Sequence, residues 1–275
     1  MSATPRQPPN ARPHQPPVAV VKLGGSCLDL LDASWWDDLA RHGRERPLIL
    51  LHGWSRPLQR LHPCHRRPSA MLRDRYGNQS RWTTPEVIDD IKTVSSAVSR
   101  EVLAQLRQRD VTAEWLLGSD GLISAGPGER LWWRGRQLVE LENLVGPPTS
   151  VNTARLDHTR PGHVPLVTPL ARNTAGQEVN TDADRAAAAV AGAVGAADLV
   201  LVTDVSHLIA DGQPVHSITE ETAITWRNKV ATGGMRKKLR AACEALERGV
   251  ERVVIGNAPV TALLTTHAGT VVTRA

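Results

Sequence analysis

The stretch NTDADRAAAAVAGAVGAADLVLVTDVSHL, at residues 180–208, decides the fold of this chain because it passes from a helix into a buried strand. Its alanine-rich part predicts a helix over 183–195, and Thr181 or Asp182 supplies the side-chain oxygen that an N-cap needs. An apolar strand over 199–203 follows. A helix that leads into such a strand is typical of an α/β fold, in which polar chemistry gathers at the strand ends.

A second stretch, KVATGGMRKKLRAA at 229–242, combines paired glycines with lysines. Gly233 and Gly234 stand where another helix is expected to begin, so backbone N–H groups can approach an anion there, and the helix dipole favours negative charge. Lys238, one turn inside this helix, adds a mobile positive charge that suits phosphate. Taken alone, paired glycines before a helix are more often loop punctuation than a binding site.

Near the other end of the chain, residues 18–23 form a short apolar strand that runs into the sequence KLGGS. Lys22 stands at the carboxyl end of this strand, and Gly24 and Gly25 form the turn after it. Ligands of open α/β sheets bind at such strand ends. Two lysine–diglycine elements in one α/β chain therefore predict two positive charges that converge on one transferred phosphoryl group.

The remaining elements alternate in the way that a parallel sheet with crossover helices requires. The clearest helix covers 85–109, with Thr84 as its cap and Pro85 at its first position. Pro165 and Pro169 interrupt the strand expected at 164–170, so we expect its pairing to be partial. Further helices are expected at 32–43, 218–228 and 235–247, strands at 47–51, 111–117, 164–170, 252–255 and 269–273, and a hairpin from 131–133 and 137–141.

Length and composition limit the class of protein. The 275 residues can bury a substantial core, and no run of eighteen apolar residues is present, so no membrane span is expected. Residues 1–17 are rich in proline and predict a disordered tail. The three cysteines have no disulfide or metal spacing, which indicates a reduced, cytoplasmic protein without a metal site. The net charge of +5 suits an acidic partner.

Positive charge is concentrated in the basic segment, residues 56–82, which holds seven arginines against one acid, Asp74. The segment has neither a helical nor a strand period. A long irregular segment in a compact domain is usually functional or disordered. Seven arginines suit a surface that docks an acidic protein and steers a tethered substrate, although a basic loop without function is the alternative. Nucleic acid is a weaker partner because the aromatic residues there are few.

Four short elements lie at the strand and helix ends described above. They are Lys22-Leu23-Gly24-Gly25-Ser26, Asn180 with Asp184-Arg185-Ala186-Ala187, Thr203-Asp204-Val205, and Thr232-Gly233-Gly234-Met235 with Lys238. Together they make the chain, over about 18–275, resemble the amino acid kinase family. Within it the chain is most similar to acetylglutamate kinase and to its relatives that phosphorylate an amino acid held on a small acidic amino-group carrier protein (LysW-type).

The resemblance implies a three-layer α/β/α sandwich with a mainly parallel open central sheet and two lobes. Residues 18–180 would form an N-terminal lobe for the acceptor, the carrier and dimerisation, and 181–275 a C-terminal lobe for ATP. Lys22 would contact the transferring phosphoryl group, Lys238 the departing phosphates, and Asp184 would hold both lysines in position. No base is required because a carboxylate acceptor is already ionised, so catalysis is positioning plus electrostatics, with Mg²⁺ on the phosphates.

The other site residues also follow from the resemblance. Trp54 departs from the family pattern, which has glycine there, and its indole could crowd the acceptor. Phosphate-contacting backbone is assigned to Gly24, Gly25, Gly53 and Trp54, substrate binding to Arg81 and Asn180, nucleotide binding to Thr203, Asp204, Gly233, Gly234 and Met235, and carrier docking to Arg56, Arg60, Arg66, Arg67, Arg73 and Arg75.

The first hypothesis is therefore an ATP-dependent kinase that makes an acyl phosphate on a glutamate-like or aminoadipate-like amino acid carried by such a protein. The runner-up is N-acetylglutamate kinase of arginine biosynthesis. A non-catalytic homologue that binds the carrier is a third reading, which Trp54 favours and which the joint presence of Lys22, Asp184 and Lys238 opposes. No GxxxxGK sequence followed by Ser or Thr is present, so a P-loop kinase is not expected. A homodimer is expected by analogy.

Overall fold

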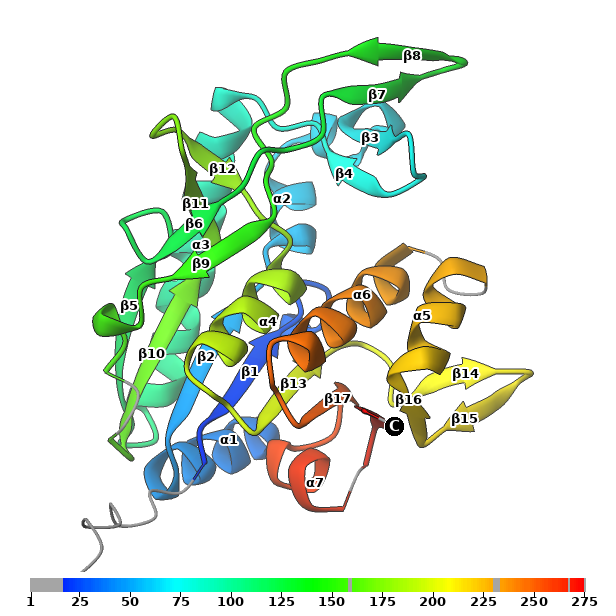
Figure 1. Ribbon diagram of the computed structural model, residues 1–275. Coiled ribbons are helices and arrows are strands. Elements are labelled where there is room, and N and C mark those ends of the chain that lie inside the picture. Colours follow the sequence, from blue (N-terminus) through cyan, green and yellow to red (C-terminus); the bar gives the residue numbers. More distant parts are fainter. Residues whose placement is uncertain (1–16, 158–159, 230–232, 267, 275) are drawn as a thin grey trace, which may run out of the picture.

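A twisted, mostly parallel sheet forms the centre of the computed structural model, which describes residues 17–157, 160–229, 233–266 and 268–274 (Figure 1). The predicted tail lies outside these residues except for Pro17. From one edge to the other, the sheet contains β16 (Ser217–Thr219), β18 (Thr270–Thr273), β17 (Arg252–Gly256), β13 (Asp198–Val202), β1 (Ala19–Leu23), β2 (Leu48–His52), β10 (His163–Thr168) and β5 (Thr112–Leu117). Only the β17–β18 pair is antiparallel.

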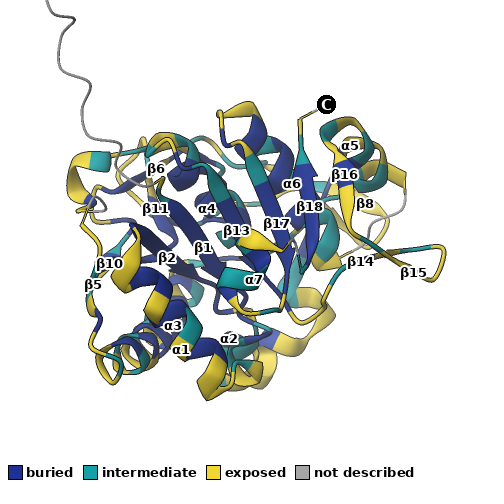
Figure 2. Cartoon of the chain, turned by 90° about the horizontal axis from the view of Figure 1, so that it is seen from below, coloured by how far each residue is buried: buried dark blue, intermediate teal, exposed yellow. Residues whose placement is uncertain are grey.

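Helices cover both faces of this sheet, because each central strand is apolar on both sides. Val20 of β1 packs in the core under α4 (Ala183–Ala193), α5 (Glu220–Lys229) and α6 (Gly233–Glu247). Its neighbours Val21 and Leu23 pack on the other side with α1 (Ala33–Glu45), α3 (Pro85–Arg107) and α7 (Val260–Thr265). Figure 2 shows the buried strands between helices whose outer faces are exposed. The predicted three-layer α/β/α architecture is confirmed.

Local sequence explains the helix starts and one strand irregularity. Thr84 caps α3 by accepting from the Val87 N–H at 3.5 Å, as predicted, and Asp182, rather than Thr181, caps α4. The strand β10 lies inside the sheet, between β2 and β5. It aligns with β2 at two positions only, beyond Pro165, so the predicted partial pairing is found on that side.

The expectation that the basic segment is irregular is wrong. It contains α2 (Ser55–Leu61), 3-10 turns at Pro63–Arg66 and Pro68–Ala70, and a hairpin of β3 (Met71–Asp74) and β4 (Gln79–Arg81). Asp74 closes the hairpin turn by accepting from the N–H of Tyr76 at 2.9 Å and of Asn78 at 2.8 Å. The predicted hairpin of β7 (Leu131–Arg134) and β8 (Gln137–Glu140) pairs with β3 and completes a four-stranded outer sheet, β4-β3-β7-β8.

The outer sheet stands away from the central sheet, above α6, at the top of Figure 1. Its β3–β4 turn lies near the side chain of Arg236 on that helix, since a Cβ on Gly77 would lie 3.9 Å from Nη1 of Arg236. None of the described helices is long and apolar enough to cross a membrane. Elements without a sequence prediction include α7 and β16. They also include a sheet of β12 (Glu178–Asn180), β11 (Leu170–Asn173), β6 (Ile123–Ala125) and β9 (Pro148–Val151), the hairpin β14 (Leu208–Ala210) and β15 (Gln213–Val215), a 3-10 turn at Leu28–Leu30 and another at Thr153–Arg155.

Candidate active site

Three neighbouring strands carry polar residues at their carboxyl ends. The central strand β1 lies between β2 and β13, and the three are parallel and in register. Lys22 is therefore beside the end of β2, where Gly53 follows, and beside the end of β13, where Thr203 and Asp204 follow. The chain leaves β1 towards β2 on one side and later returns through α4 to β13 on the other side, so the strand order reverses at β1. Open α/β sheets bind ligands at this position.

A buried ion cluster lies at this position. Asp184, in the first turn of α4, has Oδ1 2.7 Å from Nζ of Lys22 and Oδ2 3.1 Å from Nζ of Lys238 on α6. All three are buried: Lys22 and Asp184 are each 5% exposed, and Lys238 is 8% exposed. Two ammonium groups share one carboxylate, so one positive charge in the cluster is unbalanced. Burying such a charge is costly, and an anionic ligand would relieve the cost.

The cluster keeps its charges in spite of burial. Burial alone would raise the pKa of Asp184, but the charges and hydrogen bonds of Lys22 and Lys238 hold it well below its usual range. Burial acts to lower the pKa of Lys238, yet Asp184 beside it keeps that pKa above the ordinary value. Asp184 is therefore an ionised, permanently engaged carboxylate, which suits a positioning group and not a base.

The turn at Gly24–Gly25 after β1 and the turn at Gly53 after β2 lie against each other beside Lys22. A Cβ on Gly25 would lie 2.6 Å from the backbone N of Ser55, and one on Gly24 would lie 2.7 Å from the carbonyl of Val202, so both positions require glycine. A Cβ on Gly53 would lie 3.6 Å from Nζ of Lys22. Among the described residues, no acceptor is found for the N–H groups of Gly25, Trp54 and Ser55. Free N–H groups beside a lysine form a site for an anion.

The start of α6 adds further donors on the other side of Lys238. Gly233 and Gly234 are exposed, while Met235 packs against the core and holds the start of the helix in place. The first backbone N–H groups of a helix have no partner within the helix, so those at this exposed start can bind a ligand. The Oγ1 of Thr203 donates to Oδ1 of the exposed Asp204 at 3.2 Å. Thr232 lies outside the described residues.

The predicted acceptor residues are joined through Thr83. Asn180 donates from Nδ2 to Oγ1 of Thr83 at 3.3 Å, and that hydroxyl donates to the carbonyl of Arg81 at 3.1 Å. Burial lowers the pKa of the half-buried Arg81 guanidinium, which donates to the carbonyl of His65 at 3.3 Å and has no acidic partner among the described residues. An unpaired, partly desolvated guanidinium is suited to hold a carboxylate.

Comparison with known proteins identifies the family. The model of the amino acid kinase family matches residues 17–257. The chain belongs to the amino acid kinase family. It is accordingly an ATP-dependent phosphotransferase, and its fold is that of the family.

Similar proteins fall into two named groups. An acetylglutamate kinase of Geobacillus kaustophilus is 33% identical over 86% of this chain and 89% of its own length. A protein of Pyrobaculum calidifontis, provisionally named LysW-aminoadipate/LysW-glutamate kinase, is 32% identical over 94% of this chain and 99% of its own. The fold also matches a solved structure, smu.665 of Streptococcus mutans, with a TM-score of 0.74 at 24% identity, covering 94% of this chain and 99% of that one.

The indole of Trp54 is packed inside the protein. It is 6% exposed and packs in an apolar cluster with Leu58 of α2, Ile88 and Ile91 of α3, and Leu170. The side chain packs against α2 and α3, while the backbone N–H of Trp54 has no acceptor among the described residues. Trp54 thus extends the core under α2.

The arginines of the basic segment differ in their partners. Arg60 and Arg56 lie 2.6 and 3.8 Å from Oδ2 of Asp29, in the turn that follows the KLGGS loop. Arg75 lies 3.5 Å from Oε2 of Glu129. Of the remaining members, Arg66 donates to the Gln59 carbonyl, while Arg67 and Arg73 are exposed and have no acidic partner within the described ranges.

One buried residue was missed by sequence reasoning. His52, at the end of β2, is 0% exposed, and burial lowers its pKa to about 4, so its ring is neutral. Its Nε2 lies 2.8 Å from Oγ of Ser99 and 3.3 Å from Oγ1 of Thr168, which also accepts from Nε1 of Trp115 at 2.9 Å. The signal in the sequence that could have identified His52 is its position as a polar residue at the end of an otherwise apolar strand. This network fixes the start of the Gly53 turn.

Proposed function

We propose that this protein transfers the γ-phosphoryl group of ATP to the side-chain carboxylate of glutamate or aminoadipate, whose amino group is held by a small acidic carrier protein. The product is an acyl phosphate. The observation that carries phosphoryl transfer is the buried Lys22–Asp184–Lys238 cluster with its unbalanced positive charge. Its position at three strand ends, beside free backbone N–H groups, suits a phosphate chain.

In this mechanism the acceptor carboxylate attacks as the ion that it already is at neutral pH. Lys22 and the N–H groups of Gly25 and Trp54 stabilise the transferring phosphoryl group as its charge spreads. Lys238 stabilises the departing phosphates, and Asp184 keeps the two ammonium groups at fixed positions. Catalysis is then positioning and electrostatic stabilisation without a protein base.

The substrates would bind on opposite sides of the cluster. Arg81 and Asn180 would hold the acceptor, within an N-terminal lobe of 18–180, and the start of α6 with Thr203 and Asp204 would hold the nucleotide, within a C-terminal lobe of 181–275. Mg²⁺ would be bound chiefly by the phosphates, because no group of three or more described His, Cys, Asp or Glu residues could hold a metal. The ion would neutralise phosphate charge.

Two observations support the carrier. One is the set of exposed arginines in the basic segment that contains Arg81, and the other is the similarity to proteins named LysW-aminoadipate/LysW-glutamate kinase. A second copy of the chain is proposed along β5, which is an edge strand and presents Trp115 at 38% exposure. A cytoplasmic protein agrees with three free cysteines.

The test is a comparison of acceptors. Purified protein with ATP and Mg²⁺ is given either LysW loaded with glutamate or free N-acetylglutamate, and transfer is followed by ADP release. We expect a kcat/KM at least about ten-fold higher for the loaded carrier, a difference of 1.4 kcal/mol. Equal or better use of the free acceptor would remove the carrier from the proposal.

N-acetylglutamate kinase is the second candidate, and the 33% identity with a named acetylglutamate kinase favours it. A non-catalytic carrier-binding homologue is the third, and the intact ion cluster opposes it. Lys238→Ala tests the third candidate, because loss of transfer in this variant excludes a non-catalytic protein.

A further inference from the structure

Strand register places the acceptor residue Arg81 on one face of the outer sheet. Side chains alternate between faces along a strand, and directly opposed residues share a face. Arg81 on β4 opposes Met71 on β3, and Arg73, two residues further, opposes Trp133 on β7. Trp133 in turn opposes Leu138 on β8. These five residues therefore lie on one side of the sheet, which we call the arginine face.

The opposite side of the outer sheet is the one that packs on the protein. Leu72, Asp74 and Trp132, which alternate with the residues above, are 5%, 9% and 2% exposed. On the arginine face, Trp133 and Leu138 are 42% and 40% exposed, and Arg73 is also exposed. An exposed apolar pair on a sheet whose other side is already packed marks a surface for a partner.

Large apolar side chains are unusually dense in this part of the molecule. Eight large apolar side chains are exposed among the described residues, and three of them, Tyr76, Trp133 and Leu138, belong to the outer sheet or its turn. Arg73 lies directly opposite Trp133 in register, and Glu140, two residues from Leu138 on the same face, is paired with Arg130. A centre of Trp and Leu with arginine beside it has the composition of an interface for an acidic partner.

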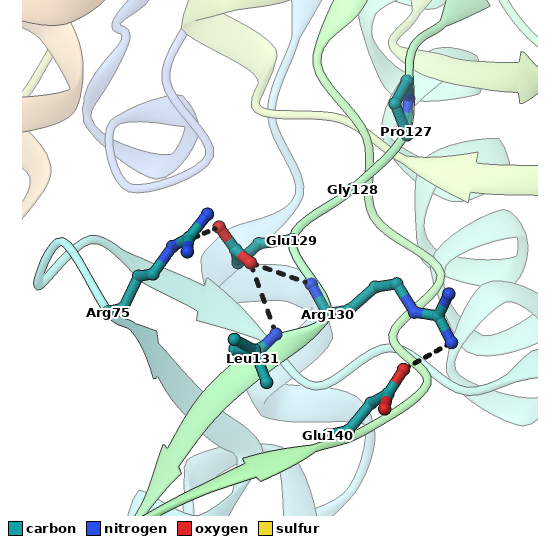
Figure 3. A pocket seen from close by; sticks show the side chains of 7 residues that line it. All are labelled: Arg75, Pro127, Gly128, Glu129, Arg130, Leu131 and Glu140. Carbon is teal, nitrogen blue, oxygen red and sulfur yellow. Dashed lines mark hydrogen bonds and ion pairs between the residues drawn. The ribbon is translucent and has the colours of Figure 1, made fainter.

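Beyond Trp133, the same face ends in a hollow between β7, β8 and the 127–130 loop (Figure 3). Two arginines line it, and each is paired with a glutamate: Arg75 with Glu129, and Arg130 with Glu140. The arginine side chains of Arg130 and Arg75 are 80% and 49% exposed, so water screens both pairs. Carboxylates of a partner can therefore exchange with these glutamates at low cost.

We infer that the arginine face docks the acidic carrier protein, with the Trp133–Leu138 pair at the centre of the contact and Arg73, Arg75 and Arg130 around it. This inference rests on the proposed carrier function and names its surface. Arg81 lies two strands across the sheet and two residues along it from Trp133. With standard strand spacings this separation is roughly 12 Å. A carrier seated there can reach Arg81 with a short tether, since an extended chain spans about 3.4 Å per residue.

The experiment measures transfer to LysW loaded with glutamate by wild type and by Trp133→Ala, Leu138→Ala and Arg73→Ala. The control variants are Arg134→Ala, on the other face of β7, and Ile209→Ala, which removes an apolar side chain of 60% exposure on β14. We expect KM for the loaded carrier to rise about ten-fold or more in the first set, as for interface hot spots, with kcat little changed. The thermal midpoint and the Kd for ATP report folding.

Each outcome has one meaning. A KM that does not change in Trp133→Ala and Leu138→Ala, or that rises equally in the controls, overturns the docking surface and leaves the carrier function standing. No transfer from wild type to the loaded carrier, together with transfer to free N-acetylglutamate, overturns the carrier function and the docking surface with it. A KM effect confined to the arginine face supports both.

Discussion

The buried cluster predicts unequal losses of stability for two substitutions that both slow the reaction. Asp184→Asn removes the carboxylate that pairs with both Lys22 and Lys238, whose Nζ atoms lie 2.7 and 3.1 Å from its oxygens. Two buried ammonium groups then lose this shared partner, and breaking a buried pair in this way costs about 3–5 kcal/mol. Lys238→Met instead leaves the neutral Lys22–Asp184 pair. An apolar chain of similar length replaces Lys238, so this variant should lose less than about 2 kcal/mol.

Activity should fall in both variants. Removing a group that stabilises developing charge typically lowers kcat by about 10²–10³-fold. The assays are urea unfolding at pH 7 and ADP release with a carboxylate acceptor. Equal losses of unfolding free energy in Asp184→Asn and Lys238→Met would refute the reasoning, because the charge balance of the cluster would then have no effect on stability.

The pH dependence supplies a second check on the same cluster. The pKa of Asp184 is lowered in the folded state, so its stabilising contribution is complete above the ordinary carboxyl value and is lost as pH falls through the lower folded value. The stability gap between wild type and Asp184→Asn should therefore narrow below about pH 4. The pKa of Lys238 is raised, so its contribution is present below the ordinary lysine value and is lost only as pH rises beyond it.

Three further predictions concern the groups around the cluster. Arg81→Ala should raise KM for the carboxylate acceptor about ten-fold or more, because a charge-assisted hydrogen bond is lost, and should leave KM for ATP unchanged. An equal rise in KM for ATP would contradict a role of Arg81 in binding the acceptor alone. Gly25→Ala should lower kcat at least about ten-fold, because its Cβ would lie 2.6 Å from the N of Ser55 and part the two turns; wild-type kcat would contradict this contact. The pKa of His52 is about 4 in the folded state, below the ordinary histidine value, so the free energy of unfolding of wild type should fall as pH drops from that ordinary value to about 4. His52→Asn should lack this loss. Identical pH dependence of stability in the two proteins would contradict a buried, neutral His52.

The sequence predicted the central sheet and the ion cluster because their signals are local. Lys22 and Lys238 each accompany a glycine pair at the end of a strand or the start of a helix. Such positions face the same edge of a parallel sheet, so their convergence followed from topology. Asp184 followed from its place in the first turn of α4, although its contact with both lysines required the packing of α4 on α6.

The outer sheet was not predictable in the same way. In β3 the exposed face carries Met71 and Arg73, while the buried face carries Leu72 and Asp74, so no apolar alternation marks the strand. Asp74 is buried because it accepts hydrogen bonds from the hairpin turn. The partner strand β7 lies far along the chain, and pairing between distant segments leaves little trace in either one. The network of His52 is hidden for the same reason.

Trapping of the product tests the central claim most directly. Protein, ATP, Mg²⁺ and a carboxylate acceptor, glutamate-loaded LysW or free N-acetylglutamate, are incubated with hydroxylamine, which converts an acyl phosphate into a hydroxamate and releases phosphate. We predict hydroxamate in an amount equal to the ADP formed with wild type, and a loss of about 10²-fold or more with Lys238→Met. ADP without hydroxamate, or a rate that survives in Lys238→Met, would contradict transfer to a carboxylate between the two lysines.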